Sequence, residues 1–556
     1  LREYLDKDIN FSWQSDSDTE VILNSYISSR RNNVSLDSLF SSLNGIFSLA
    51  IWDSKTEQLI LARDAFGVKP LYYSQNESGF FFSSEIKAFS KLGVNISEIN
   101  PVAVDRHLSY IWSPGKETIA SSIFKLGPGE LMIIKDGKIQ SHRNWYIPSY
   151  SRGLTKISNR TDSIQLCRKY LRKAVHRQLI SDVPLGAFLS GGLDSSSIVA
   201  FAKEKIPNIQ CFTILSKIKT DNDGFADDYP YAKKVARKLE VPLEVVEFSN
   251  EDLAQNLEEM VYQLDEPLAD PACMSVLMIS KIARKNGIKV LLSGTGGDDI
   301  FTGYRRHLAL TNEYCWSWLP FSTRKLINHL SLRLPKNNAF TRRLAKLFSG
   351  AHLSSDNRLL NYFRWINESE LNNIYDPIFK QRLESYSSVN PIAYFLNRLP
   401  KKLTRLEKML AIEQRFFLTE HNLLYTDKMS MQAGIEVRVP FLDKELVDFA
   451  FKISDRYKQR GSTSKWILKK AMEPYLPKDI IYRPKTGFGV PLRRWLKYEL
   501  RDWLYEILSE SNLNKFGLFN PQSVTQLVKD NELGKIDASY TLLSIATIQL
   551  WCSRYL

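Results

Sequence analysis

The stretch Phe188–Ser197 (FLSGGLDSSS) brings glycines, hydroxyls and a carboxylate to the junction of a strand and a helix. Two glycines let the backbone turn its amides inward, and a helix N-terminus adds partial positive charge. Ser190, Ser195 and Ser196 supply hydroxyl donors. A lone SGG also occurs in plain turns, but the whole pattern predicts a phosphate cradle without the GK[ST] of a P-loop. Asp194 is suited to ligate Mg²⁺ there, and it can also cap the helix.

A second glycine-rich stretch, Val290–His307 (VLLSGTGGDDIFTGYRRH), follows a second expected strand. Its glycines allow a ligand to approach the backbone closely, and Asp298 and Asp299 offer a second carboxylate for a metal. An acidic surface turn is the alternative. Two such loops at the ends of two strands predict one cleft for a nucleotide and a second substrate.

Three further segments carry basic residues that could neutralise a departing pyrophosphate. They are Asp427–Asp443 around Arg438, Ser464–Met472 with Lys465 at the start of a helix, and the glycine-containing Arg483–Pro491. Taken singly, each basic residue could equally be a solvated surface residue.

The elements that must position these residues change in character near residue 150. Before it, short apolar runs separated by Gly, Asn and Ser predict a strand-rich, antiparallel domain with a helix near Asp18–Arg30 and a hairpin tip at Asp136-Gly137. After it, strands and helices alternate, which predicts a parallel sheet covered by helices. From about residue 310 the pattern is mainly helical. We therefore expect an α/β protein with domains at 1–150 and 160–556, joined by a linker at Ser149–Asn159.

Composition narrows the function classes. The chain has 556 residues, 44% hydrophobic and 24% charged, and no apolar run approaches the roughly 18 residues of a membrane span. Its five cysteines lie far apart and form no CxxC pair, which favours a reducing cytoplasm over a disulfide framework. The net charge of +14 suggests nucleic acid, but basic residues do not alternate with aromatic ones. We expect neither a nucleic-acid nor a membrane partner, and the oligomeric state stays open, a homodimer included.

Taken together and in this order, SGGLDSS, SGTGGDDIFTGY, EVRVPFLD and the KWIL helix resemble the glutamine-dependent asparagine synthetase family. The first half is similar to that family's N-terminal-nucleophile (Ntn) glutaminase domain, with NGIFSLAIWD, ARDAFGVKPLYY and SSEIKA as landmarks. The resemblance implies an Ntn-type domain followed by an ATP-pyrophosphatase (PP-loop) domain. It implies a carbon–nitrogen ligase that adenylates a carboxylate with ATP and Mg²⁺, releases pyrophosphate, and amidates the acyl-adenylate with ammonia from glutamine.

Carried over to matching positions, the resemblance assigns roles to individual residues. The residues expected to bind the ATP phosphates are Leu189, Ser190, Gly191, Gly192, Leu193, Asp194, Ser195 and Ser196. Those expected to contact the rest of the nucleotide are Ile214, Ser293 and Gly294. Asp194 and Asp298 would ligate Mg²⁺, and Lys465 would stabilise the transition state. Tyr304 and Arg438 would line the active site, and Asp18 would bind the amino group of glutamine.

The sequence departs from the family at two points. The family's nucleophile is a cysteine at the mature N-terminus, activated by its own amine, whereas residue 1 here is Leu1 and the first cysteine is Cys167. The chain as written is therefore expected not to hydrolyse glutamine. A truncated sequence of a complete enzyme is the favoured explanation, and loss of the activity in evolution is the alternative. The second departure is Thr295, where asparagine synthetases carry a glutamate tied to forming the aspartyl-adenylate.

Thr295 leaves the acceptor open between aspartate and a sugar carboxylate. SGTGGDD looks more like family members of polysaccharide gene sets that are presumed to amidate uronic acids. Two other readings also remain. One is a tRNA-modifying enzyme with the same pyrophosphatase loop, which the net charge favours and the glutaminase-like first half opposes. The other is a paralogue that binds nucleotide without catalysis, which both intact glycine loops oppose.

Overall fold

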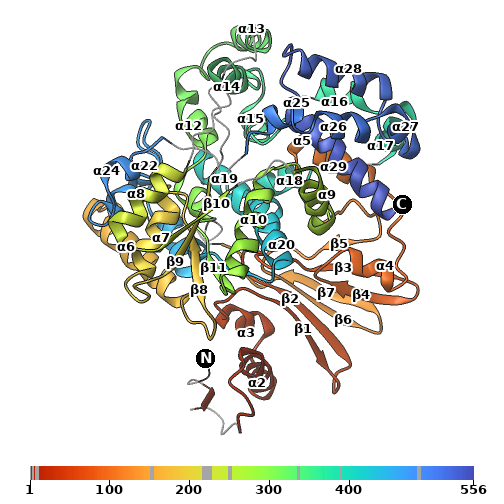
Figure 1. Cartoon of the computed structure of the whole chain (residues 1–556). Helices are drawn as coiled ribbons and strands as arrows, with labels where there is room; N and C mark the ends of the chain where they lie inside the picture. The colour runs from red at the N-terminus through yellow and green to blue at the C-terminus, as the bar shows by residue number, and fades with distance from the viewer. Residues whose placement is uncertain are drawn as a thin grey trace.

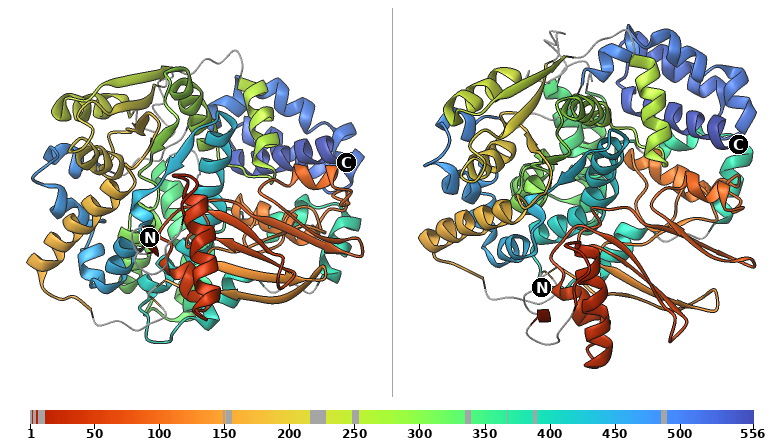
Figure 2. Two further views of the ribbon diagram at one scale, coloured as in Figure 1. Left: turned by 90° about the horizontal axis from the view of Figure 1, so that it is seen from below. Right: turned by 60° about the horizontal axis from the view of Figure 1, so that its bottom comes forward.

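The computed structural model describes residues 2, 5–6, 12–148, 150, 156–215, 228–247, 253–334, 339–366, 368–386, 390–484 and 490–556. The antiparallel strands of the first 150 residues gather on one side, and a parallel sheet with its helices occupies the other (Figures 1 and 2). This is the α/β arrangement that the sequence predicts. Residues 149 and 151–155 of the expected linker, and the centre of the Arg483–Pro491 segment, lie outside the described residues.

The N-terminal part contains two antiparallel sheets, of four strands in the order β1-β2-β6-β7 and of three in the order β4-β3-β5. The expected hairpin tip is present, with Asp136 (φ 52°) and Gly137 (φ 68°) in the left-handed conformation that tight hairpin turns need. The elements are α2 (Asp18–Arg31), α3 (Leu36–Ser42), β1 (Ser48–Asp53), β2 (Gln58–Arg63), β3 (Tyr72–Asn76), β4 (Gly79–Ser83), α4 (Lys87–Lys91), α5 (Pro101–Tyr110), β5 (Phe124–Lys125), β6 (Glu130–Lys135) and β7 (Lys138–Asn144).

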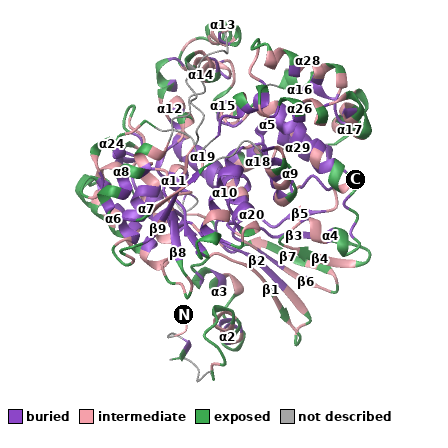
Figure 3. Cartoon of the chain, in the orientation of Figure 1, coloured by how far each residue is buried: buried purple, intermediate pink, exposed green. Residues whose placement is uncertain are grey.

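The second sheet is parallel, with five strands in the order β10-β9-β8-β11-β12. The expected strands and crossover helices are present, and β12, within the EVRVPFLD motif, adds an edge strand that was not predicted. Figure 3 shows this sheet among the buried residues of the molecule. The elements are α6 (Arg160–Arg177), β8 (Leu185–Phe188), α7 (Leu193–Ala202), β9 (Gln210–Leu215), α8 (Tyr229–Leu239), β10 (Leu243–Glu247), α9 (Leu253–Leu264), α10 (Ala272–Lys285), β11 (Val290–Leu292) and β12 (Glu436–Arg438).

The C-terminal part is helical, as expected. Its long last helix is apolar on nearly all sides and buried, with Trp551 1% exposed. The helices are α11 (Gly297–Phe301), α12 (Arg305–Thr311), α13 (Phe321–Leu332), α14 (Ala339–Phe348), α15 (Ser355–Asn361), α16 (Glu368–Ile374), α17 (Pro377–Ser385), α18 (Pro391–Arg398), α19 (Arg405–Ile412), α20 (Leu424–Gln432), α21 (Lys444–Lys452), α22 (Asp455–Lys458), α23 (Trp466–Met472), α24 (Lys478–Ile481), α25 (Leu492–Lys497), α26 (Arg501–Ile507), α27 (Glu510–Phe516), α28 (Pro521–Glu532) and α29 (Ser539–Tyr555), with short 3₁₀ turns at Asn312–Cys315 and Pro440–Leu442.

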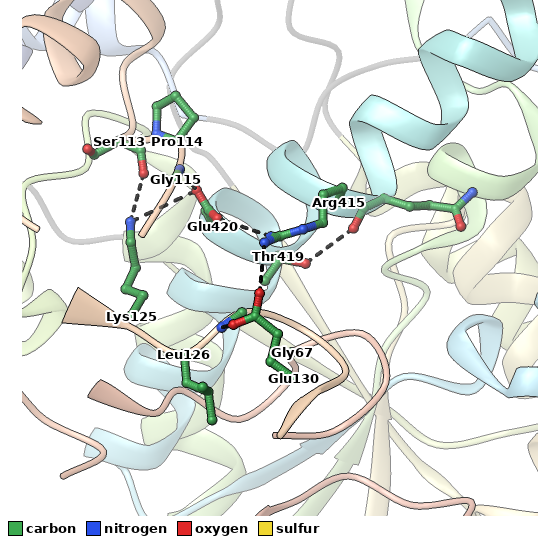
Figure 4. A network of polar contacts seen from close by, with 12 residues as sticks. Gly67, Ser113, Pro114, Gly115, Lys125, Leu126, Glu130, Arg415, Thr419 and Glu420 are labelled. Carbon is green, nitrogen blue, oxygen red and sulfur yellow. Dashed lines mark hydrogen bonds and ion pairs between the residues drawn. The ribbon is translucent and has the colours of Figure 1, made fainter. Parts of the chain in front are cut away.

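A π-helix, Glu413–Leu423, connects α19 to α20 and touches the antiparallel part. Figure 4 shows its contacts: Glu420 accepts a hydrogen bond from the Gly115 amide at 2.7 Å and lies 3.9 Å from Lys125, and Arg415 bridges Glu130 and Glu420 at 3.6 Å each. Eleven residues of π-helix are unusual, since such helices are mostly single turns at functional sites. The two halves of the chain are thus joined by buried charges as well as apolar packing.

The charge of Glu420 should make the stability of this junction depend on pH. Burial raises the pKa of its carboxyl to about 6 from an ordinary 4.5, although Lys125 and Arg415 oppose the rise. Because the folded pKa is the higher one, Glu420 contributes stability below about pH 4.5 that is lost as pH rises through 6. The pH-dependent part is about 2 kcal/mol. We expect Glu420→Gln to remove it, so that unfolding free energies of wild type and variant diverge by that amount between pH 4.5 and 7.

Glu117→Gln provides the control with the opposite sign. Burial alone would raise the pKa of Glu117, but Arg106, at 2.6 Å, outweighs it and the pKa is lowered. Its contribution therefore appears as pH rises and is lost as pH falls below the ordinary value. If the unfolding free energies of wild type and Glu420→Gln changed equally with pH, burial at the junction would not raise the pKa of Glu420.

Candidate active site

The register of the parallel sheet places the two glycine loops side by side. β8 pairs with β11, with Leu185 opposite Val290 and Ala187 opposite Leu292. Both strands end within one residue of each other, so the loops that follow them leave the same edge of the sheet. In open α/β sheets this edge, at the carboxyl ends of the strands, is where ligands bind.

The first loop is closed by hydroxyl contacts at the N-terminus of α7. Ser190 and Ser195 lie 3.1 Å apart between their Oγ atoms, and Ser195 Oγ also accepts a hydrogen bond from the Ser190 amide at 3.2 Å. Gly191 has φ +64°, and a Cβ there would lie 2.4 Å from backbone atoms of Tyr231 and Ala232. Only glycine therefore fits this turn. Ser196 is fully buried, and its amide donates to Gly192 within the first turn of the helix.

Lys465 lies between the two predicted metal ligands. Its Nζ pairs with Asp194 of the first loop and with Asp298 of the second. The lysine is 5% exposed, and it begins α23 in the left-handed conformation (φ 52°), held by a 3.3 Å hydrogen bond from its amide to Thr302 Oγ1. A non-glycine residue in this conformation stores strain of about 1–3 kcal/mol, which the surrounding structure must support. Three distant segments thus converge on one cation and two carboxylates.

The second loop carries a hydroxyl pair. Ser293 Oγ lies 2.8 Å from Thr295 Oγ1 and also accepts a hydrogen bond from the Thr295 amide at 3.2 Å. Gly294 packs against the first loop, since a Cβ there would lie 2.9 Å from the Ser195 amide nitrogen. Ile214 is the residue before the last of β9, the neighbour of β8, and is partly buried. Ser293, Gly294 and Ile214 therefore share this edge of the sheet with the phosphate loop.

Tyr304 follows the second loop and is held by its hydroxyl. The hydroxyl lies 3.2 and 3.3 Å from the Asp299 carboxylate oxygens and accepts a 2.9 Å hydrogen bond from Asn422. Burial, followed by the charges of Asp299 and Asp298, raises the pKa of Tyr304 well above its ordinary value. Burial and the Glu413 carboxylate likewise raise the pKa of Asp299. Both groups therefore favour their neutral forms.

Two residues of the expected set lie elsewhere. Arg438 is on β12, but its guanidinium donates to the carbonyls of Gln178 and Ile180 after α6, and only its backbone carbonyl meets the site, at the Ser293 amide. Asp18 is exposed in the first turn of α2, which lies on the antiparallel side (Figure 1). The backbone contact of Arg438 with Ser293 supports the edge of the parallel sheet. Asp18 belongs to the N-terminal half and not to this site.

Sequence reasoning missed several residues around the site. The sequence indicated Arg483 only as part of a basic loop. In the structure it pairs with Asp228 at 2.7 Å, and its guanidinium lies 3.7 Å from the centre of the Tyr231 ring. Tyr231 is also the residue whose backbone lies against Gly191. Asn422 and Glu413, both from the π-helix, gave no motif signal. Long-range contacts of this kind have no local pattern from which they could be found.

Two family models match the chain, "Glutamine amidotransferase domain" at residues 1–146 and "Asparagine synthase" at residues 166–553. The chain belongs to the asparagine synthase family. It is a glutamine-dependent carbon–nitrogen ligase, and the family uses ATP. Across the described residues, every helix is too short or too polar to cross a membrane.

Proteins similar to this chain carry different names. "Asparagine synthetase [glutamine-hydrolyzing] 1" of Bacillus subtilis (strain 168) is 31% identical over 100% of this chain and 83% of its own length. "Putative asparagine synthetase [glutamine-hydrolyzing]" of Mycobacterium tuberculosis (strain ATCC 25618 / H37Rv) is 29% identical over 92% of this chain and 76% of its own. "Amidase chyE" of Penicillium rubens is 26% identical over 93% and 79%.

Gly303 provides a test of the ion cluster. A Cβ there would lie 1.5 Å from Asp298 Oδ1 and 2.5 Å from Lys465 Cε, so Gly303→Ala must displace both. We expect ATP-dependent ligase activity to fall by at least about 100-fold, because misplacement by 1 Å can cost that much. Gly45→Ala is the control, since its Cβ would meet only Phe47 at 3.9 Å. Full activity of a folded Gly303→Ala protein would separate this cluster from catalysis.

Proposed function

We propose that this ligase activates a carboxylate with ATP and converts it to an amide. The acceptor carboxylate attacks the α-phosphorus, pyrophosphate leaves, and ammonia then displaces AMP from the acyl carbon. The observation that carries the proposal is the cluster of Lys465, Asp194 and Asp298 beside the hydroxyl-rich loop. A buried cation next to an anion cradle stabilises negative charge that develops on the departing phosphates.

The loop residues Leu189 to Ser196 are proposed to hold the phosphates that leave together. Gly191 and Gly192 turn the backbone, and the N-terminus of α7 adds its dipole to the amides. Ser190 and Ser195 exchange their mutual contact for phosphate oxygens. Ile214, Ser293 and Gly294, at the same sheet edge, are proposed to contact the nucleotide.

Asp194 and Asp298 are proposed to hold Mg²⁺. Two carboxylates from neighbouring loops suit this ion, which commonly takes one or two protein carboxylates and completes its shell with phosphate oxygens and water. When bound, Mg²⁺ neutralises phosphate charge. Because Lys465 contacts both carboxylates, its ammonium group also lies close to the proposed phosphate position. There it can stabilise negative charge in the transition state. Tyr304, partly buried beside Asp299, and Arg438, through its backbone carbonyl, are proposed to line the site.

The N-terminal half is proposed to supply the ammonia. Residues 1–150 would form the glutaminase domain, with Asp18 binding the amino group of glutamine, and residues 160–556 the ligase domain. The contacts of the π-helix with Gly115 and Lys125 join the halves through buried groups. Ammonia released in the N-terminal half would pass across this junction to the acyl-adenylate.

Aspartate is the acceptor that the synthetase relatives favour, with asparagine as the product. A specific observation supports a second acceptor, the carboxylate of a uronic acid. Thr295 forms a neutral hydroxyl pair with Ser293, whereas a glutamate there would present a charge. Hydroxyls match the hydroxyls of a sugar, and they cannot pair with the ammonium group of aspartate as a carboxylate does.

The first test measures pyrophosphate release by the purified protein with ATP, Mg²⁺, ammonium and either aspartate or a uronic acid. Asp194→Asn should abolish release with every acceptor, because one carboxylate of the cluster becomes neutral. Asp162→Asn is the matched control, as Asp162 also lies in the first turn of a helix, α6. No release from a folded wild-type protein with any acceptor would sink the proposal.

The second test addresses the acceptor through Thr295. Thr295→Glu should raise release with aspartate relative to the uronic acid by about tenfold, which corresponds to ~1.4 kcal/mol. Thr295→Ser keeps the hydroxyl and should leave the ratio unchanged. If both variants alter the two acceptors equally, Thr295 does not set the choice of acceptor.

A further inference from the structure

The segment between the active-site loops and α15 has an unusual charge pattern. No aspartate or glutamate occurs between Glu313 and Asp356, while seven arginines and lysines do: Arg324, Lys325, Arg333, Lys336, Arg342, Arg343 and Lys346. Helices α13 and α14 lie within it, and we call the described residues 314–334 and 339–348 the basic hairpin. In Figure 1 its first helix, α13, forms the outermost top edge of the molecule.

The basic hairpin also exposes large apolar side chains. Of the 24 exposed ones among the described residues, seven lie in it: Tyr314, Trp318, Phe321, Leu326, Leu330, Leu332 and Phe340. Trp318 is 73% and Phe340 72% exposed, so most of the surface of both side chains is in water. Single exposed apolar residues are ordinary, but a concentrated group indicates an interaction surface.

Leucines and cations share the outward face of α13. Leu326 (56% exposed) and Leu330 (54% exposed) are one turn apart, and Lys325, His329 and Arg333, which are also exposed, flank them. Figure 3 shows this helix as mostly exposed. The solvent face of a soluble helix is normally polar, whereas leucine mixed with basic residues is typical of a helix that lies on a membrane.

We propose that the basic hairpin binds the surface of an anionic lipid bilayer. Twelve residues make α13 about 18 Å long, too short to span a hydrocarbon core of about 30 Å, so it would lie in the interface plane. Leu326 and Leu330 would enter the acyl boundary, and Trp318 would sit at headgroup depth, where tryptophan is enriched. Exposed basic residues, such as Lys325 and Arg333, contribute about fivefold each to binding of an anionic surface.

Two other occupants fit less well. A second copy of the chain meeting this face across a two-fold axis would bring cations against cations, because the segment contains no acidic residue. A nucleic acid would match the charge but leave the leucines of α13 in water. An anionic bilayer satisfies both the charged and the apolar side chains. The expectation of no membrane partner rested on the lack of a spanning run, and side-chain exposure on a folded helix is visible only in the structure.

The position of the basic hairpin connects it to the active site. Tyr304 follows the second loop, and α12 begins at the next residue and ends at Thr311. The basic hairpin starts three residues later, at Tyr314, and its first helix, α13, begins at Phe321. A bilayer on this face would therefore lie along the segment that leaves the site. The inference does not depend on which acceptor is used.

The test is co-sedimentation of the whole chain with vesicles of phosphatidylcholine alone or mixed equally with phosphatidylglycerol. We expect binding to the anionic vesicles only, and loss of binding at high salt, where charges are screened. Leu326→Glu combined with Leu330→Glu should lower the partition coefficient by about tenfold or more, since it removes apolar contact and adds repulsion. Lys325→Glu with Arg333→Glu should lower it similarly.

Leu92→Glu combined with Ile180→Glu is the matched control, because these residues are 49% and 78% exposed and lie away from α13. It should bind like the wild type, and pyrophosphate release with a soluble acceptor should be unchanged in all variants. Equal binding of the wild type and both hairpin variants, or no binding to anionic vesicles at low salt, would overturn the proposal. So would the finding that the hairpin variants abolish self-association or RNA binding instead of vesicle binding.

Discussion

The contact of Lys465 with Asp194 and Asp298 is the constraint on which the rest of the ligase half depends. Two carboxylates from different loops can be buried together only if a cation compensates them, since an unpaired buried charge costs several kcal/mol. That requirement explains the register of β8 against β11, the glycine at 303, and the left-handed start of α23. Each would be costly or arbitrary without the cluster, and together they bring the three charges to one point.

The π-helix extends the same constraint toward the N-terminal half. Its first residue, Glu413, pairs with His307 at 2.7 Å, and Asn422, near its end, holds Tyr304. Between them Thr419 donates to the Phe66 carbonyl and Glu420 meets Gly115, both in the antiparallel part. The wider π turn lets one segment present polar groups in both directions. A movement of the antiparallel part relative to the π-helix would therefore change the positions of Tyr304 and His307, which lie near Asp298 and Asp299.

Much of the fold was predictable because its signals are local. Alternation of strands and helices indicated the parallel sheet, and Asp136-Gly137 indicated the tip of a hairpin. The loops around Ser190 and Ser293 were predictable for the same reason, since glycine and hydroxyl spacing reflects backbone geometry. β12 was missed because three residues carry too little pattern, and the π-helix because its sequence periodicity resembles that of an α-helix. The position of the Arg438 guanidinium depended on carbonyls 258 and 260 residues away.

The same distinction explains why the surface was harder to read than the site. A catalytic loop needs particular residues at particular spacings, so a short sequence motif is enough to predict its chemistry. The basic hairpin differs from an ordinary amphipathic pair only in which face its leucines present, and Leu326 or Leu330 would read as core residues in any periodicity analysis. Their exposure on α13 follows from where α14 packs, leaving the far side of α13 uncovered. A face that is both apolar and cationic is stable in water only at a cost, and contact with an anionic apolar boundary removes it.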